Sequence, residues 1–318
     1  MKVIKVRDFG LPEVLHIGSA DEPRPAEAAT VIQIEAIGLG FMDASARRGE
    51  SYLASAPGFV PGYEVAGTVC GIGPGTDEHW LGRRVFAILR EGGGCAERVA
   101  VPVAELLPLP DQISAQTAVA TGLNALVAQV SVARVPIADH DRLLVRGAGS
   151  GIGLMCVQFA AMRCDTIIAT SSSEVRGEML KALGASSIWQ RTSGTPLTPA
   201  SFDVIIDTVV GNEWPSYFDR LNANGRYLIC GGIGGMPPRD FGMKILEHFH
   251  RSPTLFAASL NSIPPADIDR EATTLWEHVQ AGRISPVVDS VLPLSEIVTA
   301  HRKLDAGDVF GKIILVQD

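Results

Sequence analysis

The sequence has no apolar run close to the ~20 residues that a membrane-spanning helix needs. Positive charge is also in short supply, with 27 lysines and arginines against 35 aspartates and glutamates, for a formal net charge of −8. A surface that binds nucleic acid or anionic lipid needs a basic face, so we expect neither nucleic acid nor membrane as a partner. The first residues, MKVIKVRDFG, have no long apolar stretch after their basic side chains, which favours a cytoplasmic location.

Cysteine is scarce, with five widely spaced residues. They form neither a CxxC zinc motif nor a disulfide framework, so we expect buried, reduced thiols. Hydrophobic residues make up 46% of the chain and charged residues 19%, which is enough to build a substantial core. A chain of 318 residues exceeds the size at which single cores usually stop growing, and two domains are therefore expected.

The residue pattern changes near position 113. Before it, short alternating or β-branched runs such as VIQIEAIG and YEVAGTVCGIG are interrupted by glycine and proline, which is typical of an all-β unit. Residues 113–130 are rich in Ala, Leu and Val, and they predict a helix with Ser114 as its cap.

Strands and helices then alternate, in an order that predicts a doubly wound parallel sheet covered on both faces. The predicted strands are 143–147, 166–170, 202–209 and 226–230, and the predicted helices are 152–163, 173–184 and 214–221, with Ser173 as a cap, Gly184 as a stop and a turn at Asn224 and Gly225. The remaining predicted elements are a strand at 254–260, a long helix at 266–280, a helix at 295–307 that ends at Gly307, and a closing strand at 311–316.

The strongest single feature is LLVRGAGSGIGLMCVQ, in which a strand, a glycine-rich turn and a helix follow one another. At such a turn, backbone N–H groups and the positive end of the helix dipole face a dinucleotide pyrophosphate, and small residues let it approach closely. Ala148, Ser150 and Gly153 occupy the GxGxxG positions, and the βαβ context supports the assignment over a purely structural turn. The predicted cofactor-binding residues of the turn are Ala148, Gly149, Ser150, Gly151, Ile152 and Gly153.

The second predicted strand of this unit is followed by hydroxyl groups and an arginine instead of a carboxylate. NAD-preferring sites carry an acidic residue there, which accepts hydrogen bonds from the ribose. Hydroxyls and a guanidinium can instead hold a 2′-phosphate, so we predict NADPH as the cofactor. The residues assigned to this role are Thr170, Ser171, Ser172, Arg176 and Arg191, although Arg176 could also be a solvated helix residue.

A competing pattern, the GxxxGxG of short-chain dehydrogenases, fits Gly147, Gly151 and Gly153. That class needs a tyrosine followed four positions later by a lysine that lowers the tyrosine pKa. None of the four tyrosines is followed by lysine at that spacing. The glycine-rich turn also comes late in the chain, after a long β-rich stretch, whereas it opens most short-chain dehydrogenases.

The whole chain resembles the medium-chain dehydrogenase/reductase superfamily, and within it the zinc-independent quinone oxidoreductase branch of ζ-crystallin-like proteins. The matching stretches are VIQIEAIGLGFMDASARRG, FVPGYEVAGTVCGIGPGT, GCAERVAVP, ATGLNAL, GAGSGIGLMCVQFA, FDVIIDTVVG and LPLSEIVTAHRKLDAGDVFGKIILV. The resemblance implies an α/β protein with a GroES-like β-rich catalytic domain from residues 1–112 and 258–318 and a Rossmann NADP(H)-binding domain from residues 113–257. It also implies a homodimer, for which TLFAASL is a candidate edge strand.

The resemblance also bears on metal binding, since one large branch of the superfamily uses a catalytic zinc. The ligands of that branch fall at Gly40, Tyr63 and near Thr117, where this chain has no zinc-binding cysteine or histidine. The structural four-cysteine lobe is missing too. His248 and His250 are expected on one helix at a spacing that makes their side chains diverge. We therefore predict no metal site.

Without a metal, the acceptor must already be electron-poor, as in a quinone or an α,β-unsaturated carbonyl. Positioning and hydrogen-bond donors then supply most of the rate. The predicted catalytic candidates are Tyr52, which lies one position away from a cleft tyrosine of relatives, and Tyr63, which replaces the zinc histidine. The resemblance places Thr121 near the nicotinamide and Asp207 near the cofactor crevice.

Two neighbouring carboxylates receive other roles, since Asp43 is expected to be structural and Glu64 conformational. Two alternative functions stay open at this point. One is an acyl-thioester enoyl reductase on the same scaffold. The other is a structural or sensor protein that binds NADPH without useful catalysis, which the changed residues at Gly40 and Tyr52 make conceivable.

Overall fold

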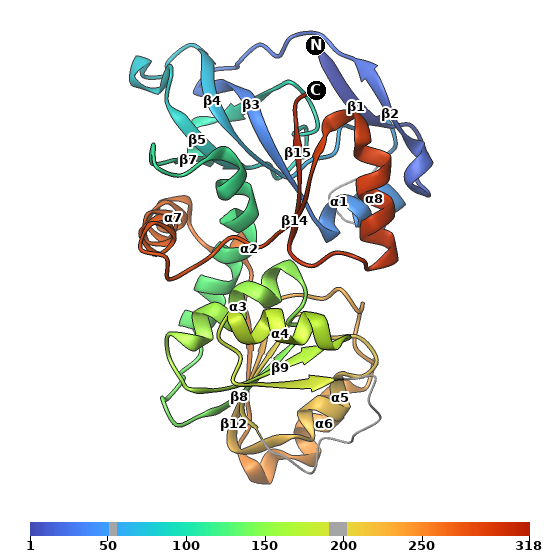
Figure 1. Cartoon of the computed structure of the whole chain (residues 1–318), viewed down its shortest axis with the longest axis vertical. Helices are drawn as coiled ribbons and strands as arrows, with labels where there is room; N and C mark the ends of the chain where they lie inside the picture. Colours follow the sequence, from blue (N-terminus) through green and yellow to red (C-terminus); the bar gives the residue numbers. More distant parts are fainter. Residues whose placement is uncertain (51–55, 191–201) are drawn as a thin grey trace. The chain divides into compact units, whose positions relative to one another are not determined.

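The computed structural model describes residues 1–50, 56–190 and 202–318, which form two compact units (Figure 1). Unit 1 comprises Met1–Leu123, Pro265–Gln280 and Pro286–Asp318, and unit 2 comprises Asn124–Pro264 and Ala281–Ser285. The boundaries expected from the sequence were 112/113 and 257/258. They differ because the first part of the helix expected at 113–130 belongs to unit 1, whereas residues 258–264 and 281–285 belong to unit 2.

Unit 1 contains a seven-stranded sheet with the order β14-β15-β3-β4-β5-β7, in which β6 also pairs with β3. A separate antiparallel pair, β1 and β2, completes its β structure. The strands are β1 (Lys2–Val6), β2 (Leu15–Ser19), β3 (Ala29–Leu39), β4 (Glu64–Ile72), β5 (Arg84–Ile88), β6 (Arg98–Pro102), β7 (Leu106–Pro108), β14 (Val288–Pro293) and β15 (Lys312–Val316). The helices are α1 (Phe41–Arg48), α7 (Pro265–Gln280), α8 (Ile297–Ala306) and the first part of α2 (Ala115–Ala133).

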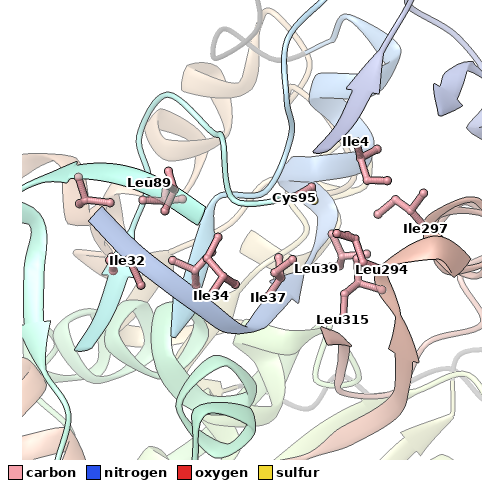
Figure 2. Close-up of a cluster of buried hydrophobic side chains, with 14 of the residues drawn as sticks. Ile4, Ile32, Ile34, Ile37, Leu39, Leu89, Cys95, Leu294, Ile297 and Leu315 are labelled. Atoms are coloured by element: carbon pink, nitrogen blue, oxygen red, sulfur yellow. The ribbon is translucent and has the colours of Figure 1, made fainter. Parts of the chain in front are cut away.

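The core of unit 1 is organised along β3. Figure 2 shows Ile32, Ile34, Ile37 and Leu39 along this strand, all members of one buried cluster. The core-facing residues of β3 have even numbers up to Ile34 and odd numbers from Ile37 onward, because the β3–β4 register shifts between Ile34 and Ala36. A bulge of this kind places one extra residue in the strand and so reverses which positions face the core.

Unit 2 is a six-stranded parallel sheet with the order β10-β9-β8-β11-β12-β13. Figure 1 shows α3 and α4 on one side of this sheet and α5 and α6 on the other, as right-handed crossovers require. The elements are β8 (Arg142–Arg146), α3 (Gly151–Ala161), β9 (Thr166–Ser171), α4 (Glu174–Ala182), β10 (Ser187–Gln190), β11 (Phe202–Asp207), α5 (Trp214–Phe218), β12 (Leu221–Ile229), α6 (Phe241–Glu247) and β13 (Thr254–Ala257). The strand order reverses between β8 and β11, and ligands of such sheets bind beyond the carboxyl ends of the strands at that point.

Local signals in the sequence predicted several helix ends. The Ser114 hydroxyl accepts a hydrogen bond from the Thr117 amide at 3.0 Å, and the Ser173 hydroxyl accepts one from the Arg176 amide at 3.3 Å. Gly307 ends α8 with φ +66°. The predicted turn at Asn224 lies inside β12, where Asn224 has φ +59°.

Two predicted helices differ from the structure. The helix expected at 214–221 is shorter, because it ends at Phe218 and β12 starts at Leu221. The helix expected at 113–130 is broken at Gly122, which has non-helical backbone angles. A Cβ at this position would approach the ring of Phe86 to 2.5 Å, so only glycine fits the break.

All five cysteines are free; Cys70 is exposed, and the other four are buried. Among the helices that the structure describes, none has both the length and the apolar character that a membrane crossing requires.

Candidate functional site

The glycine-rich turn joins β8 to α3 in unit 2, beside the switch point of the sheet. Ser150 is the N-cap of α3, and its hydroxyl accepts a hydrogen bond from the amide of Gly153 at 3.1 Å. A Cβ on Gly153 would overlap the carbonyl oxygen of Gly147, and Gly147 itself has φ +73°. The turn therefore keeps its shape only with glycine at these two positions.

The first turn of a helix has four N–H groups without intrahelical carbonyl partners, and Ser150 uses one of them here. The N-terminal end of α3 also carries partial positive charge from the helix dipole. An anionic diphosphate fits this combination, because small residues leave the backbone accessible and the dipole attracts negative charge. The predicted turn residues Ala148, Gly149, Ser150, Gly151, Ile152 and Gly153 thus lie together at one helix end.

Two of the residues assigned to the 2′-phosphate are already engaged within unit 2. The Thr170 hydroxyl accepts a hydrogen bond from the Gly147 amide at 2.9 Å, and the Ser171 hydroxyl donates one to the Ser173 carbonyl at 2.8 Å. Both residues are buried; Thr170 joins the end of β9 to the turn, whereas Ser171 joins it to the segment before α4. Ser172 is exposed and Arg176 is partly exposed at the start of α4, where they are accessible to a ligand.

Asp207, at the end of β11, is fully buried. Its Oδ1 accepts hydrogen bonds from the amides of Val209 (2.7 Å) and Val210 (3.0 Å). Its Oδ2 accepts hydrogen bonds from the Arg146 guanidinium (3.1 Å) and the Tyr227 hydroxyl (2.6 Å). Both oxygens thus have partners within the protein, and Asp207 supports the segment that follows it.

Sequence reasoning missed Arg146 and Tyr227. The available signal was a charged residue in an otherwise apolar strand, LLVRG, immediately before the turn. Burial by itself would lower the pKa of the Arg146 guanidinium. The interactions with Asp207, Tyr217 and Tyr227 outweigh that effect, so the pKa is raised. Burial raises the pKa of the Tyr227 phenol, which therefore remains a hydrogen-bond donor.

In unit 1, the predicted catalytic residue Tyr63 is buried and packs in a small cluster with Ala46. Its hydroxyl has no hydrogen-bond partner among the described residues. Burial raises the pKa of this phenol, with a further contribution from Asp43. A buried hydroxyl without a partner is unusual in a folded protein and is compatible with a partner supplied by a ligand or a water molecule.

Asp43 has the structural role that was expected. It is buried, and its carboxylate accepts hydrogen bonds from the amides of Gly40 (2.9 Å) and Gly62 (3.0 Å). Burial raises the pKa of Asp43 to about 7. The carboxylate therefore joins the start of α1 to the loop that precedes β4.

Glu64 forms a buried ion pair with Lys312, the first residue of β15. The second carboxylate oxygen of Glu64 accepts a hydrogen bond from the Leu123 amide at 3.2 Å, just after the break in α2. Burial raises the pKa of Glu64, and Lys312 opposes that effect. The conformational role expected for Glu64 stays a prediction, and Lys312 is a partner to which the sequence pattern did not point. Thr121, before the break, is buried, and its hydroxyl donates to the Thr117 carbonyl at 2.8 Å.

The positions that hold zinc in relatives have other uses here. The Thr117 hydroxyl accepts a hydrogen bond from Ser114, and a Cβ on Gly40 would lie 3.9 Å from the Lys312 ammonium. No group of three or more histidine, cysteine, aspartate and glutamate side chains is gathered for a metal within residues 1–50, 56–190 and 202–318.

The two neighbouring histidines do not share a helix, contrary to expectation. His248 is the C-cap of α6, while His250 lies in the following short 3-10 helix, and their ring centroids are 6.3 Å apart. The helix α6 ends at Glu247, so the two histidines lie beyond its last residue. The His248 ring instead hydrogen-bonds Asp219 at 2.6 Å.

Two predicted site residues lie outside the described part of the chain. They are Tyr52, a catalytic candidate, and Arg191, a candidate for the 2′-phosphate. Both assignments stay predictions.

Comparison with known proteins adds relatives over the full length of the chain. Residues 26–111 match the alcohol dehydrogenase GroES-like domain, and residues 183–315 match the zinc-binding dehydrogenase family. A quinone oxidoreductase of Lama guanicoe is 26% identical over 328 residues, which cover 99% of this chain and 97% of the relative. A 2-haloacrylate reductase of a Burkholderia species is 25% identical, over 96% of this chain and 94% of the relative.

A mycobacterial protein solved in complex with NADPH superimposes with a TM-score of 0.88 at 24% identity, covering 99% of this chain and 100% of that one. At that identity the likeness establishes a shared fold. The GroES-like family match lies entirely within unit 1, and the second match includes segments of both units.

Proposed function

Because the chain belongs to the medium-chain dehydrogenase/reductase superfamily, we propose that it is an oxidoreductase that transfers hydride from NADPH to a small, electron-poor acceptor. The observation that carries the proposal is the glycine-rich turn at the switch point of the parallel sheet. There the Ser150 hydroxyl caps α3, and a Cβ on Gly153 would fill the space of the turn. These features fit a dinucleotide pyrophosphate.

The preference for NADPH rests on the end of β9. Ser171 and Ser172 occupy the position where NAD-preferring sites carry a carboxylate, and Arg176 follows in the first turn of α4. The guanidinium of Arg176 supplies the positive charge that a 2′-phosphate needs, and Ser172 supplies an accessible hydroxyl. Thr170 and Ser171 act indirectly, because Thr170 holds the strand end against the turn and Ser171 holds it to the segment before α4.

When bound, the nicotinamide supplies a hydride to a conjugated carbon or oxygen of the acceptor, which also takes up one proton. The chain has to orient the acceptor and donate a hydrogen bond to the oxygen on which negative charge develops. The Tyr63 hydroxyl is a candidate donor because it is protonated and has no hydrogen-bond partner among the residues that the structure describes. Tyr52 is the second candidate. The relatives named for reduction of quinones and of a haloacrylate support an acceptor of this class.

We propose that catalysis is independent of zinc, although one matched family carries zinc in its name. The three positions that would supply zinc ligands hold Gly40, Tyr63 and Thr117. Glycine supplies no metal-binding side chain, and neither tyrosine nor threonine is a usual zinc ligand. Elemental analysis of the purified protein is expected to find zinc far below one equivalent per chain.

The cofactor site is tested by comparing Arg176→Ala with Lys181→Ala. Both substitutions remove a positive charge from α4, but only Arg176 lies near the end of β9. We expect Arg176→Ala to weaken NADPH binding about tenfold, which is the loss of about 1.4 kcal/mol, and to leave NADH binding within about twofold. Equal weakening by both variants, or of both cofactors, would count against the assignment of the 2′-phosphate site.

The reaction is tested by following NADPH oxidation with a simple quinone, a haloacrylate and an acyl-thioester enone. Turnover of the quinone or the haloacrylate supports the proposed function. Turnover of the thioester alone would instead establish the alternative of an acyl-thioester enoyl reductase. Tight NADPH binding without turnover of any acceptor in a broad panel would favour the structural or sensor protein.

We also propose that the chain forms a homodimer through β13. This strand lies at one end of the strand order in unit 2, and its Leu255 side chain is exposed. An apolar strand edge pairs readily with a second copy of itself about a two-fold axis. Sedimentation analysis is expected to give a dimer for the wild-type protein and a monomer for Leu255→Lys.

A further inference from the structure

The glycine-rich turn of unit 2 packs against residues 208–211, which follow β11. The Thr208 hydroxyl donates to the Arg146 carbonyl at 3.1 Å, and its oxygen lies 3.2 Å from the Ser150 hydroxyl oxygen. A Cβ on Gly147 would overlap the side chains of Thr208 and Val209. The placement of residues 208–211 therefore determines one wall of the turn.

The intrinsic backbone preferences of residues 208–211 do not account for this placement. Val210 has φ +58°, a left-handed conformation that is unfavourable for a β-branched residue. Such a conformation persists only when neighbouring groups hold it. Here Asp207 Oδ1 accepts the amides of Val209 and Val210, so the carboxylate holds the strained residue directly.

Asp207 in turn depends on Arg146. The Nη1 of Arg146 donates to Asp207 Oδ2 at 3.1 Å and to the Val210 carbonyl at 2.8 Å, so one nitrogen contacts both the strained residue and the carboxylate that holds it. The guanidinium carbon of Arg146 lies 4.0 Å from the ring centroid of Tyr217. Arg146 also pairs with Glu213 at 3.2 Å, but Asp207 is fully buried, so water cannot solvate the Asp207 carboxylate if Arg146 is removed.

We propose that Arg146 is a positioning residue for the cofactor site, which fixes residues 208–211 against the turn that receives the pyrophosphate. Arg146 acts through Asp207 and the Val210 carbonyl and does not touch the cofactor itself. The inference rests on the proposed function, because the turn matters to activity only if it binds NADPH. It also reassigns Asp207 from cofactor contact to the support of this segment.

The experiment compares Arg146→Met with Arg226→Met. Arg226 of β12 is the control, because it too forms an ion pair in unit 2, with Asp141 at 2.8 and 3.1 Å, and Asp141 lies just before β8, at the opposite end of that strand from the turn. Arg146→Lys and Tyr227→Phe are milder variants. The lysine keeps the charge but has no planar fork, and the phenylalanine removes only the hydrogen bond to Asp207.

Three quantities are measured for each variant: the urea midpoint of unfolding, the dissociation constant of NADPH, and the hydrogen exchange of the Val209 and Val210 amides without cofactor. Both methionine variants are expected to unfold at lower urea concentrations. Arg146→Met is expected to bind NADPH at least tenfold more weakly and to exchange these amides at least tenfold faster. Arg146→Lys and Tyr227→Phe are expected to lie between it and the wild type. Arg226→Met is expected to stay within twofold of the wild type in both quantities.

Equal effects of Arg146→Met and Arg226→Met on NADPH binding would overturn the inference, since a general loss of stability would then explain both. Unchanged amide exchange in Arg146→Met would overturn it as well, even if the wild type binds NADPH. If Arg146→Met folds too poorly to assay, wild-type affinity and exchange in both Arg146→Lys and Tyr227→Phe would likewise overturn it. If the wild type binds no NADPH, the proposed function fails, and faster amide exchange in Arg146→Met would still establish that Arg146 fixes residues 208–211.

Discussion

The imidazole of His301 is fully buried in α8, and neither ring nitrogen has a hydrogen-bond partner among the described residues. Burial, together with the positive charges of Arg47 and Arg48 on α1, lowers the pKa of His301 to about 3. Asp305 acts in the opposite direction but is already paired with both arginines. Protonation of His301 therefore opposes folding, and the perturbation to test is its replacement by leucine.

The magnitude follows from the two pKa values. An unfolded histidine titrates near 6.5, so between that pH and about 3 the unfolded chain binds a proton that the folded chain excludes. The stability linked to His301 is thus complete above pH 6.5 and is lost progressively as the pH falls. Between pH 8 and pH 5 the loss is about 2 kcal/mol, out of roughly 5 kcal/mol in total.

The contribution of the buried Asp43 to stability has the opposite pH dependence. Burial raises the pKa of its carboxyl to about 7, so the folded chain keeps a proton that the unfolded chain releases above about pH 4. The stability linked to Asp43 is present at low pH and is lost as the pH rises through 7. The prediction therefore concerns the difference between the wild type and His301→Leu, in which the contribution of Asp43 cancels.

The assay is urea unfolding at pH 8 and at pH 5, with hydrogen exchange of the α8 amides to identify the transition of unit 1. We expect His301→Leu to lose about 2 kcal/mol less than the wild type between the two pH values. His16→Leu is the matched control, because it removes an exposed histidine from the same unit and should keep the wild-type loss. An identical loss in His301→Leu and the wild type would refute the reasoning.

Three further substitutions test the sites described above. Gly153→Ala should abolish measurable NADPH binding, because its Cβ would overlap a backbone carbonyl of the turn. Gly232→Ala is the control: its Cβ would have open space around it, and this variant should bind NADPH normally in the same titration. Tyr63→Phe should leave the urea unfolding free energy within about 1 kcal/mol of the wild type, because no described residue hydrogen-bonds the hydroxyl that it removes, and should lower kcat if that hydroxyl is the donor; full activity would exclude this role. Lys312→Met should lower the unfolding free energy by about 3 to 5 kcal/mol, because Glu64 would become an unpaired buried charge. A loss below about 1 kcal/mol would contradict a stabilising role of the Glu64–Lys312 pair.

The elements of the fold were predictable where the signal is local. Ser114 and Ser173 cap their helices because a serine before an apolar periodic run can satisfy a free amide without help from distant residues. The break in α2 at Gly122 was not predictable in this way. Phe86 of β5 occupies the space of a Cβ at the break and so requires glycine there, and that contact follows only from the packed structure of unit 1.

In the candidate site, too, features set by local sequence were predictable and features set by contacts between distant residues were not. The turn from Ala148 to Gly153 was predictable, because backbone amides, small residues and a helix start are encoded within one short segment. The partners of its supporting side chains were not, because they come from other elements. Asp207 looked like a cofactor residue at the end of its strand, but its position in the packed sheet surrounds it with Arg146 and Tyr227.

Glu64 and Lys312 illustrate the limit most clearly, because their ion pair joins residues 248 positions apart. The sequence of GKIILV predicts a closing strand but not what its lysine contacts. The partner of a buried charge is set by strand order and register, here by the pairing of β15 with β3 and of β3 with β4. A single sequence does not specify that pairing.

The central claim is that the glycine-rich turn of unit 2 binds NADPH. The most direct measurement is a fluorescence titration of the wild-type protein and of Gly153→Ala with NADPH and with NADH. We expect saturable binding of NADPH to the wild type with an affinity at least tenfold above that for NADH, and no saturable binding to Gly153→Ala. Failure of the wild-type protein to bind either nicotinamide cofactor, or undiminished binding by Gly153→Ala, would contradict it.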